Sequence, residues 1–274
     1  MLADCHWHTM GRETAADIAK ALDTAGLDRA VLIAPYFGEG AFYPGMPIPE
    51  ANKWLAKIAS ELPDRVFGFA WIEPKLPGAV QEVERCINDY RLHGIKMIPN
   101  HWSPLDEAIF PVYEKIQDLR APTLFHSGID HGFGDSSRFC QPILFEVLIN
   151  FPRLRFALAH IGWPWVDECI ALLGRFRHEA EQYTGPGVKQ CQMFIDITPG
   201  TPPVYREDAL RKALAYCGDD YLIWGSDSHP TGAERARRVL ESDRQIFTQQ
   251  LGAAASSQQK IFGDNLMAFL KMDS

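Results

Sequence analysis

The sequence lacks the features of a membrane protein and of a nucleic-acid-binding protein. Within its 274 residues no apolar run approaches the roughly 18 residues that span a bilayer. No long block of Lys or Arg occurs, and the formal net charge is -8 at pH 7. This balance argues against nucleic acid or an anionic membrane surface as the main partner. We therefore expect neither of them as a partner of this chain.

A disulfide framework is also absent from the pattern of cysteines. The six cysteines are scattered and include no CxxC pair, which in a chain of this size predicts reduced and mostly buried thiols. The first strand is expected from Leu2, so the sequence leaves no room for a signal peptide. Together these observations predict a cytoplasmic protein.

Short apolar runs rich in β-branched and aromatic residues recur along the chain, each followed by a turn and an amphipathic stretch. Eight strands in strict alternation with eight helices imply parallel strands joined by right-handed crossovers. No GxGxxG motif follows the first strand, which disfavours a doubly wound nucleotide-binding sheet. We predict a single (β/α)8 barrel, a TIM barrel, over residues 1–274, with IFGDNLMAFLKM as one extra C-terminal helix. The strands are expected to begin near Leu2, Arg29, Val66, Gly94, Pro122, Arg155, Met193 and Tyr221.

Imidazole and carboxylate side chains gather at the ends of the predicted strands. His6 and His8 end the first strand, and they point to the same side because they are two residues apart. His126 ends the fifth strand, His160 the sixth and Asp227 the eighth, and in a parallel barrel all these ends lie on one face. Three imidazole nitrogens and one carboxylate suit zinc, or manganese or iron in a looser geometry. The sequence therefore predicts a metal site formed by His6, His8, His126 and Asp227, with one position open for water.

These residues resemble the amidohydrolase superfamily. HWH at the end of the first strand, His126, His160 and the GSD of the eighth strand carry the resemblance. AHIGWPW, IWGSDSHP and IFGDNLMAFL point to the amidohydrolase-related branch, which includes aminocarboxymuconate-semialdehyde decarboxylase-like enzymes and pyrone-dicarboxylate lactonases. The resemblance implies about one metal per chain on His6, His8, His126 and Asp227. It further implies that His160 is a catalytic acid/base, or a further ligand as in other branches, and that Asp227 also accepts a proton.

The predicted site serves more than one reaction. A zinc ion lowers the pKa of bound water from 15.7 to roughly 7, which predicts a hydrolase that cleaves a C–O or C–N bond in a small carboxylated or cyclic substrate. The same ion polarises a carbonyl oxygen, so a nonoxidative decarboxylase of the same branch is the alternative. A noncatalytic barrel that holds a metal is disfavoured by the full ligand set together with His160. No HAGE-like segment is present to supply the proton donor of a deaminase.

Four residues are candidates for binding a small-molecule substrate. Arg138 follows the fifth strand, and its planar fork suits a carboxylate, although a solvated surface arginine fits the same position. Trp102 after the fourth strand and Trp163 after the sixth would line the pocket or pack in the core. His229 shares a side with Asp227, because Ser226 and Ser228 alternate with Asp227. In the family that these residues resemble, tyrosine is more common at or next to this position. The sequence is compatible with a homodimer and does not determine the oligomeric state.

Lys96 lies inside the apolar run GIKMIP, where an unpaired ammonium is costly. One interpretation is a carboxylated lysine that bridges two metals, as in distant branches of the superfamily. The other is a lysine paired inside the barrel with Asp4, Glu73 or Asp196. The resemblance to enzymes with one metal favours the pairing.

Overall fold

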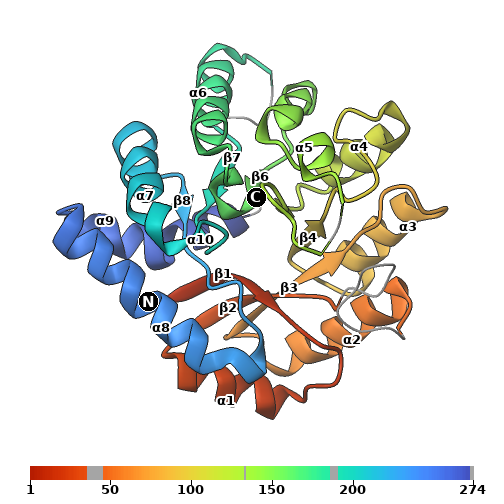
Figure 1. Cartoon of the computed structure of the whole chain (residues 1–274). Helices are drawn as coiled ribbons and strands as arrows, with labels where there is room; N and C mark the ends of the chain where they lie inside the picture. Colours follow the sequence, from red (N-terminus) through yellow and green to blue (C-terminus); the bar gives the residue numbers. More distant parts are fainter. Residues whose placement is uncertain (36–45, 133, 186–190, 272–274) are drawn as a thin grey trace.

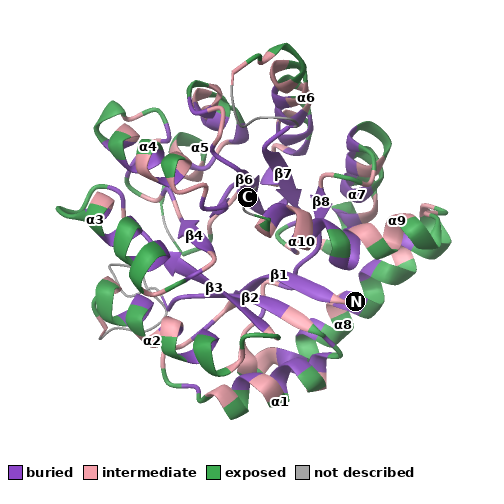
Figure 2. Cartoon of the chain, turned by 180° about the vertical axis from the view of Figure 1, so that it is seen from behind, coloured by how far each residue is buried: buried purple, intermediate pink, exposed green. Residues whose placement is uncertain are grey.

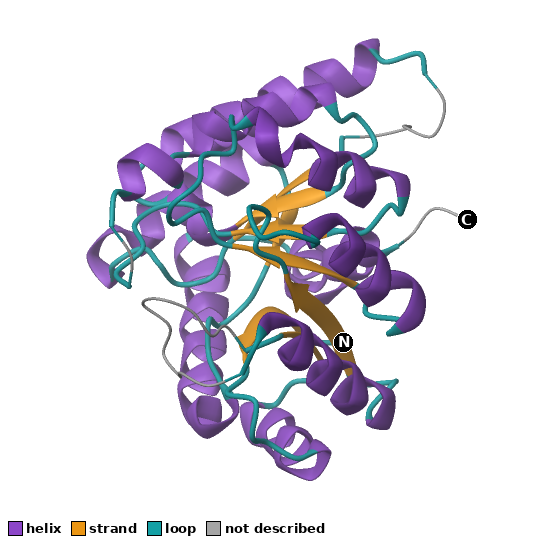
Figure 3. Cartoon of the chain, turned by 90° about the vertical axis from the view of Figure 1, so that its right-hand side faces the viewer, coloured by secondary structure: helices purple, strands orange, loops and turns teal. Residues whose placement is uncertain are grey.

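The eight strands form a barrel at the centre of the molecule. The computed structural model describes residues 1–35, 46–132, 134–185 and 191–271. All neighbouring strands pair in parallel, in the order β1 to β8, and the helices surround them (Figure 1). Seen from the side, the strands lie at the centre with helices on either side of them (Figure 3). The predicted (β/α)8 barrel is confirmed.

The strands match the predicted apolar runs closely. They are β1 (Ala3–His8), β2 (Arg29–Ile33), β3 (Val66–Trp71), β4 (Gly94–Met97), β5 (Thr123–Phe125), β6 (Phe156–Leu158), β7 (Met193–Asp196) and β8 (Leu222–Ile223). The helices are α1 (Ala15–Ala25), α2 (Ile48–Glu61), α3 (Ala79–Glu84), α4 (Phe110–Asp118), α5 (Ser136–Phe139), α6 (Val166–Gln182), α7 (Pro203–Cys217), α8 (Ala233–Gln245), α9 (Ala255–Gln259) and α10 (Asn265–Leu270). None of the helices in the described part of the chain is long and apolar enough to cross a membrane.

The strands are almost entirely buried (Figure 2), as expected when helices cover a barrel from outside and side chains fill its interior. Helix α1 shows how the sequence defines the covering layer. Thr14 and Asp17 form a reciprocal capping box at its start, and Gly26 ends it with a φ of 74°. Its buried residues, which include Ile18 and Leu22, face the barrel. The six cysteines are all unpaired and buried.

The barrel closes between β1 and the segment that follows β8. The backbone N–H of Cys5 donates to the carbonyl of Trp224 at 3.0 Å, and the N–H of His8 donates to the carbonyl of Ser228 at 2.8 Å. The segment that carries Asp227 is therefore bonded directly to the strand that carries the two predicted histidine ligands.

The extra C-terminal helix is longer than the predicted one. It starts at Ala255 rather than Ile261, and α9, a π-helical stretch (Lys260–Asp264) and α10 follow one another up to Leu270. The carbonyl of Ile261 accepts a hydrogen bond from the N–H of Trp224 at 3.1 Å. This helix therefore packs at the point where the barrel closes.

Candidate functional site

The two histidines of β1 face one another at the mouth of the barrel. The Nε2 atoms of His6 and His8 lie 3.2 Å apart, and His6 is buried whereas His8 is half-buried. The Nδ1 of His6 lies 2.7 Å from Oδ2 of Asp196, at the end of β7. The carboxylate accepts the proton of Nδ1, so the lone pair of His6 is on Nε2. Burial lowers the pKa of His6 well below its ordinary value, which keeps the imidazole neutral.

Asp227 completes a close group with these histidines. Its Oδ1 lies 3.1 Å from Nε2 of His8 and 3.6 Å from Nε2 of His6. The three donor atoms all lie within 4.8 Å of one another. Burial alone would raise the pKa of Asp227, but the hydrogen bond from His8 and the nearby imidazoles hold it well below its ordinary value. The carboxylate is therefore ionised at neutral pH.

The position of Asp227 does not come from strand alternation. Strand β8 ends at Ile223, and Asp227 has a φ of 50°, in the left-handed region that a non-glycine residue rarely adopts. The strand alternation from which we expected Asp227 and His229 to share a side therefore does not reach them. Both residues nevertheless line the same cavity, because the left-handed turn and the bonds to β1 place them there.

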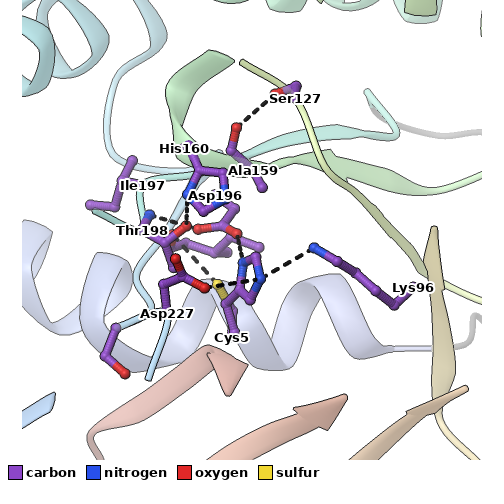
Figure 4. A network of polar contacts seen from close by, with 12 residues as sticks. Cys5, Lys96, Ser127, Ala159, His160, Asp196, Ile197, Thr198 and Asp227 are labelled. Carbon is purple, nitrogen blue, oxygen red and sulfur yellow. Dashed lines mark hydrogen bonds and ion pairs between the residues drawn. The ribbon is translucent and has the colours of Figure 1, made fainter. Parts of the chain in front are cut away.

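His126 and His160 come from the neighbouring ends of β5 and β6. The hydroxyl of Ser127 donates to the carbonyl of Ala159 at 2.6 Å and ties the two segments together (Figure 4). The ring centroids of His126 and His160 are 5.0 Å apart, and that of His160 is 5.3 Å from the ring of His6. Burial lowers the pKa values of both histidines, so they are neutral bases.

The two rings differ in their partners. Nε2 of His126 is buried and has no hydrogen-bond partner among the described residues; the nearest carboxylate, of Asp130, is 3.9 Å away. His160 has a φ of 62°, and its Nδ1 lies 3.0 Å from Oγ1 of Thr198. A Cβ at Gly200 would lie 2.6 Å from the Cβ of His160, so only glycine leaves room for this ring. His126 thus presents an unused nitrogen, whereas the ring of His160 is fixed by its neighbours.

Asp196 and Thr198 join the two halves of the site. Oδ2 of Asp196 faces His6, and its Oδ1 accepts the backbone N–H of Thr198 at 2.7 Å. Oγ1 of Thr198 lies 3.0 Å from Nδ1 of His160, so Thr198 contacts Asp196 through its backbone and His160 through its side chain. This contact occupies Nδ1 of His160, so Nε2 is the ring nitrogen left to exchange protons.

Lys96 does not form the ion pair expected of it. It is fully buried in β4, and its Nζ lies 3.2 Å from Nε2 of His6 (Figure 4). Among the described residues no carboxylate lies within 4.0 Å of the ammonium, neither Asp4, Glu73 nor Asp196. Burial lowers the pKa of Lys96 to about 8. The side chain is thus a buried cation whose polar contact is a neutral imidazole.

A cavity of about 450 Å³ opens above these groups. His229 lines it, as predicted, whereas Arg138, Trp102 and Trp163 do not. Arg138 is exposed, Trp102 is buried in the core, and Trp163 stacks on Tyr205 in a groove on the outer surface. The described residues that line the cavity are His6, His8, Thr9, Met10, Trp71, Lys96, Ile98, His126, Ile129, Asp130, His131, Gly132, His160, Pro199, Gly200, Asp227, Ser228 and His229.

The donor set fits a divalent cation. Two imidazole Nε2 atoms and a carboxylate oxygen converge within 4.8 Å, and the carboxylate behind His6 is the usual support of a metal-binding histidine. His126 lies outside this close group of three, so its role as a ligand stays a prediction. Sequence reasoning named Asp196 only as a partner for Lys96 and missed Thr198 and Asp130. A buried acid at the end of a strand, in MFID, was the available signal for Asp196.

Comparison with known proteins identifies the family. A profile described as amidohydrolase matches residues 3–271. The chain belongs to the amidohydrolase family. The resemblance predicted from the strand-end motifs is confirmed, and the chain is an enzyme of a metal-dependent family.

This amidohydrolase is similar to proteins with several activities. A 2-keto-4-carboxy-3-hexenedioate hydratase of Sphingobium sp. is 23% identical over 229 residues, which are 73% of this chain and 63% of the hydratase. The chain spans less than two-thirds of the length of the curated relatives it matches.

Two solved structures share the fold. A probable 2-pyrone-4,6-dicarboxylic acid hydrolase of Acinetobacter baumannii has a TM-score of 0.66 at 16% identity, over 98% of each chain. A 5-carboxyvanillate decarboxylase of Novosphingobium aromaticivorans with bound manganese has a TM-score of 0.63 at 17% identity, over 93% of this chain and 80% of the decarboxylase.

Proposed function

We propose that this amidohydrolase is a metal-dependent hydrolase that uses water to cleave a C–O or C–N bond of a small substrate. The observation that carries the proposal is the convergence of His6, His8 and Asp227 within 4.8 Å in the wall of a cavity of about 450 Å³. When bound, a divalent cation supplies a Lewis acid that lowers the pKa of a water ligand and polarises a substrate carbonyl. The volume suits a substrate of one ring or a short chain.

The chain's own residues would hold one cation. His6 would offer its Nε2 lone pair, His8 would offer Nε2 after losing the proton it shares with Asp227, and Asp227 would offer Oδ1. His126 is the proposed fourth ligand, because its buried Nε2 is without a partner among the described residues. Nitrogen ligands with one carboxylate favour zinc, and the manganese of the similar decarboxylase supports manganese as the alternative.

Two residues would carry the protons. Asp227 is ionised and accepts the proton of the attacking water. His160 is held by Thr198 at Nδ1, so its Nε2 would take over the proton accepted by Asp227 and deliver it to the leaving oxygen or nitrogen. General acid–base catalysis of this kind contributes about 10² to 10⁴ in rate.

A decarboxylase is the second candidate. It is supported by the likeness of the fold to the 5-carboxyvanillate decarboxylase over 93% of this chain. In that reaction His160 Nε2 would take up a proton from solvent and deliver it to the carbon that loses carbon dioxide, and water would not attack. The two candidates therefore differ in whether an oxygen atom of water enters the product.

The test is turnover in water enriched in ¹⁸O. The metal-loaded protein is incubated with 2-pyrone-4,6-dicarboxylate and with 5-carboxyvanillate, and Asp227→Asn serves as the control. We expect a ring-opened product that carries one ¹⁸O atom, without release of carbon dioxide. Carbon dioxide release without ¹⁸O incorporation would replace the hydrolase by the decarboxylase.

Two further properties belong to the proposal. A cytoplasmic location is supported by the six unpaired, buried cysteines. The partner is a small-molecule substrate, and homodimer formation stays a prediction that light scattering would check.

A further inference from the structure

Lys96 is a strong charge in the cavity wall that the proposed reaction leaves unused. It is the one lysine or arginine among the described residues that line the cavity. The ammonium is fully buried, and burying it costs free energy unless an acceptor satisfies its three N–H groups. Among the described residues, the one hydrogen-bond partner of Lys96 Nζ is Nε2 of His6, at 3.2 Å.

That acceptor is not available when His6 holds a cation. A neutral imidazole has one lone pair, and in His6 it is on Nε2 because Nδ1 donates to Asp196 at 2.7 Å. The lone pair serves either Lys96 or a metal, but not both. Binding of a metal cation by His6 therefore leaves the ammonium of Lys96 without its acceptor. It also places the positive charge of the metal beside the positive charge of Lys96.

An anionic group in the cavity removes both costs, since it accepts hydrogen bonds from the ammonium and balances the charge. Arg138, the residue expected to grip a carboxylate, is exposed and outside the cavity. The two acids of the wall, Asp130 and Asp227, disfavour a doubly charged group, such as a phosphate monoester, at Lys96. A single negative charge matches the single lysine.

We propose that Lys96 binds a carboxylate of the substrate and thereby selects for carboxylated substrates. This inference rests on the proposed function, because it takes the bound carboxylate to be part of the substrate. It concerns the binding of that substrate and not the bond that is cleaved. It also makes metal loading and carboxylate binding cooperative, because the cation frees the ammonium of Lys96.

The test is the binding of benzoate and of its neutral analogue benzamide to the zinc-loaded full chain, measured by calorimetry. Lys96→Met removes the charge and keeps the length of the side chain. A charge-assisted hydrogen bond of this kind predicts a roughly ten- to hundredfold weaker binding of benzoate, with benzamide binding unchanged. Lys96→Arg, which keeps the charge, should retain part of the affinity. Lys212→Met is the matched control, since Lys212 is an exposed lysine that pairs with Asp167 and Asp208.

Three results would overturn the inference. The first is that Lys96→Met binds benzoate as tightly as the native protein. The second is that phenyl phosphate binds more tightly than benzoate in a way that depends on Lys96. The third is loss of zinc from Lys96→Met together with a bicarbonate requirement of the native protein, which would make Lys96 a carboxylated ligand.

The binding test is separate from the proposed reaction. If benzoate binding depends on Lys96 but no substrate is hydrolysed, the hydrolase proposal fails and the inference stands. If a substrate is hydrolysed and Lys96→Met keeps its benzoate affinity, the hydrolase proposal stands and the inference about Lys96 fails. Circular dichroism of both Lys96 variants checks that the barrel is folded.

Discussion

Replacing Thr198 with valine removes the hydroxyl that contacts His160 and keeps the backbone bond to Asp196. Valine has nearly the shape of threonine, and the position is fully buried, so the packing is retained. The backbone N–H of residue 198 still bonds Oδ1 of Asp196, at 2.7 Å in the native structure. The change therefore isolates the 3.0 Å contact between Oγ1 and His160 Nδ1.

The expected effect is on the rate and not on binding. A hydrogen bond between neutral groups contributes about 0.5–1.5 kcal/mol, and without it the ring of His160 exchanges its tautomer and loses its orientation. Only part of the roughly 10² to 10⁴ of acid–base catalysis should be lost, because the imidazole remains. We expect kcat to fall about ten- to hundredfold with KM changed less than about threefold.

The assay is steady-state turnover of the substrate found in the ¹⁸O experiment, with ¹⁵N NMR of the His160 ring as a readout independent of turnover. Native protein should show one tautomer, and Thr198→Val should show a mixture of two. Thr198→Ser keeps Oγ and should restore both kcat and the single tautomer. The reasoning is refuted if Thr198→Val turns over at the native rate, or if Thr198→Ser loses as much as Thr198→Val.

Three other predictions concern the metal and its neighbours. Elemental analysis should find about one zinc or manganese per chain, whereas two metals that are both lost in Lys96→Ala would contradict a single-metal site. Asp227→Asn should leave a folded barrel that retains metal weakly and turns over more slowly by orders of magnitude, while His229→Asn should mainly alter substrate binding; near-native turnover of Asp227→Asn at saturating metal would place the centre elsewhere. His160→Ala should lose turnover and keep nearly full metal, and joint loss of metal and activity would make His160 a ligand instead.

Local patterns in the sequence predict much of the fold. Hydrophobic runs of strand length alternate with amphipathic stretches, and this periodicity depends only on neighbours along the chain. It locates all eight strands, and with them the strand ends that carry His6, His126 and His160. The start of the C-terminal helix was placed too late, because the polar segment ASSQQ precedes its apolar face and looks like a loop.

Other features are decided by contacts between distant segments. Asp227 reaches the histidines through a left-handed turn and a bond between β1 and the chain after β8, neither of which periodicity encodes. The partner of Lys96 depends on which side chains of β4 and β1 meet inside the barrel. Sequence reasoning therefore predicted an acidic partner, whereas the structure has His6 there.

The sequence by itself determined the barrel, the family and the ring of strand-end histidines, because each follows from local periodicity or from short motifs. The tertiary structure decided which of these side chains touch and which residues support them. Asp196 and Thr198 became visible as the link between His6 and His160 only there, because a hydrogen bond requires positions within about 3 Å, finer than any spacing along the chain specifies.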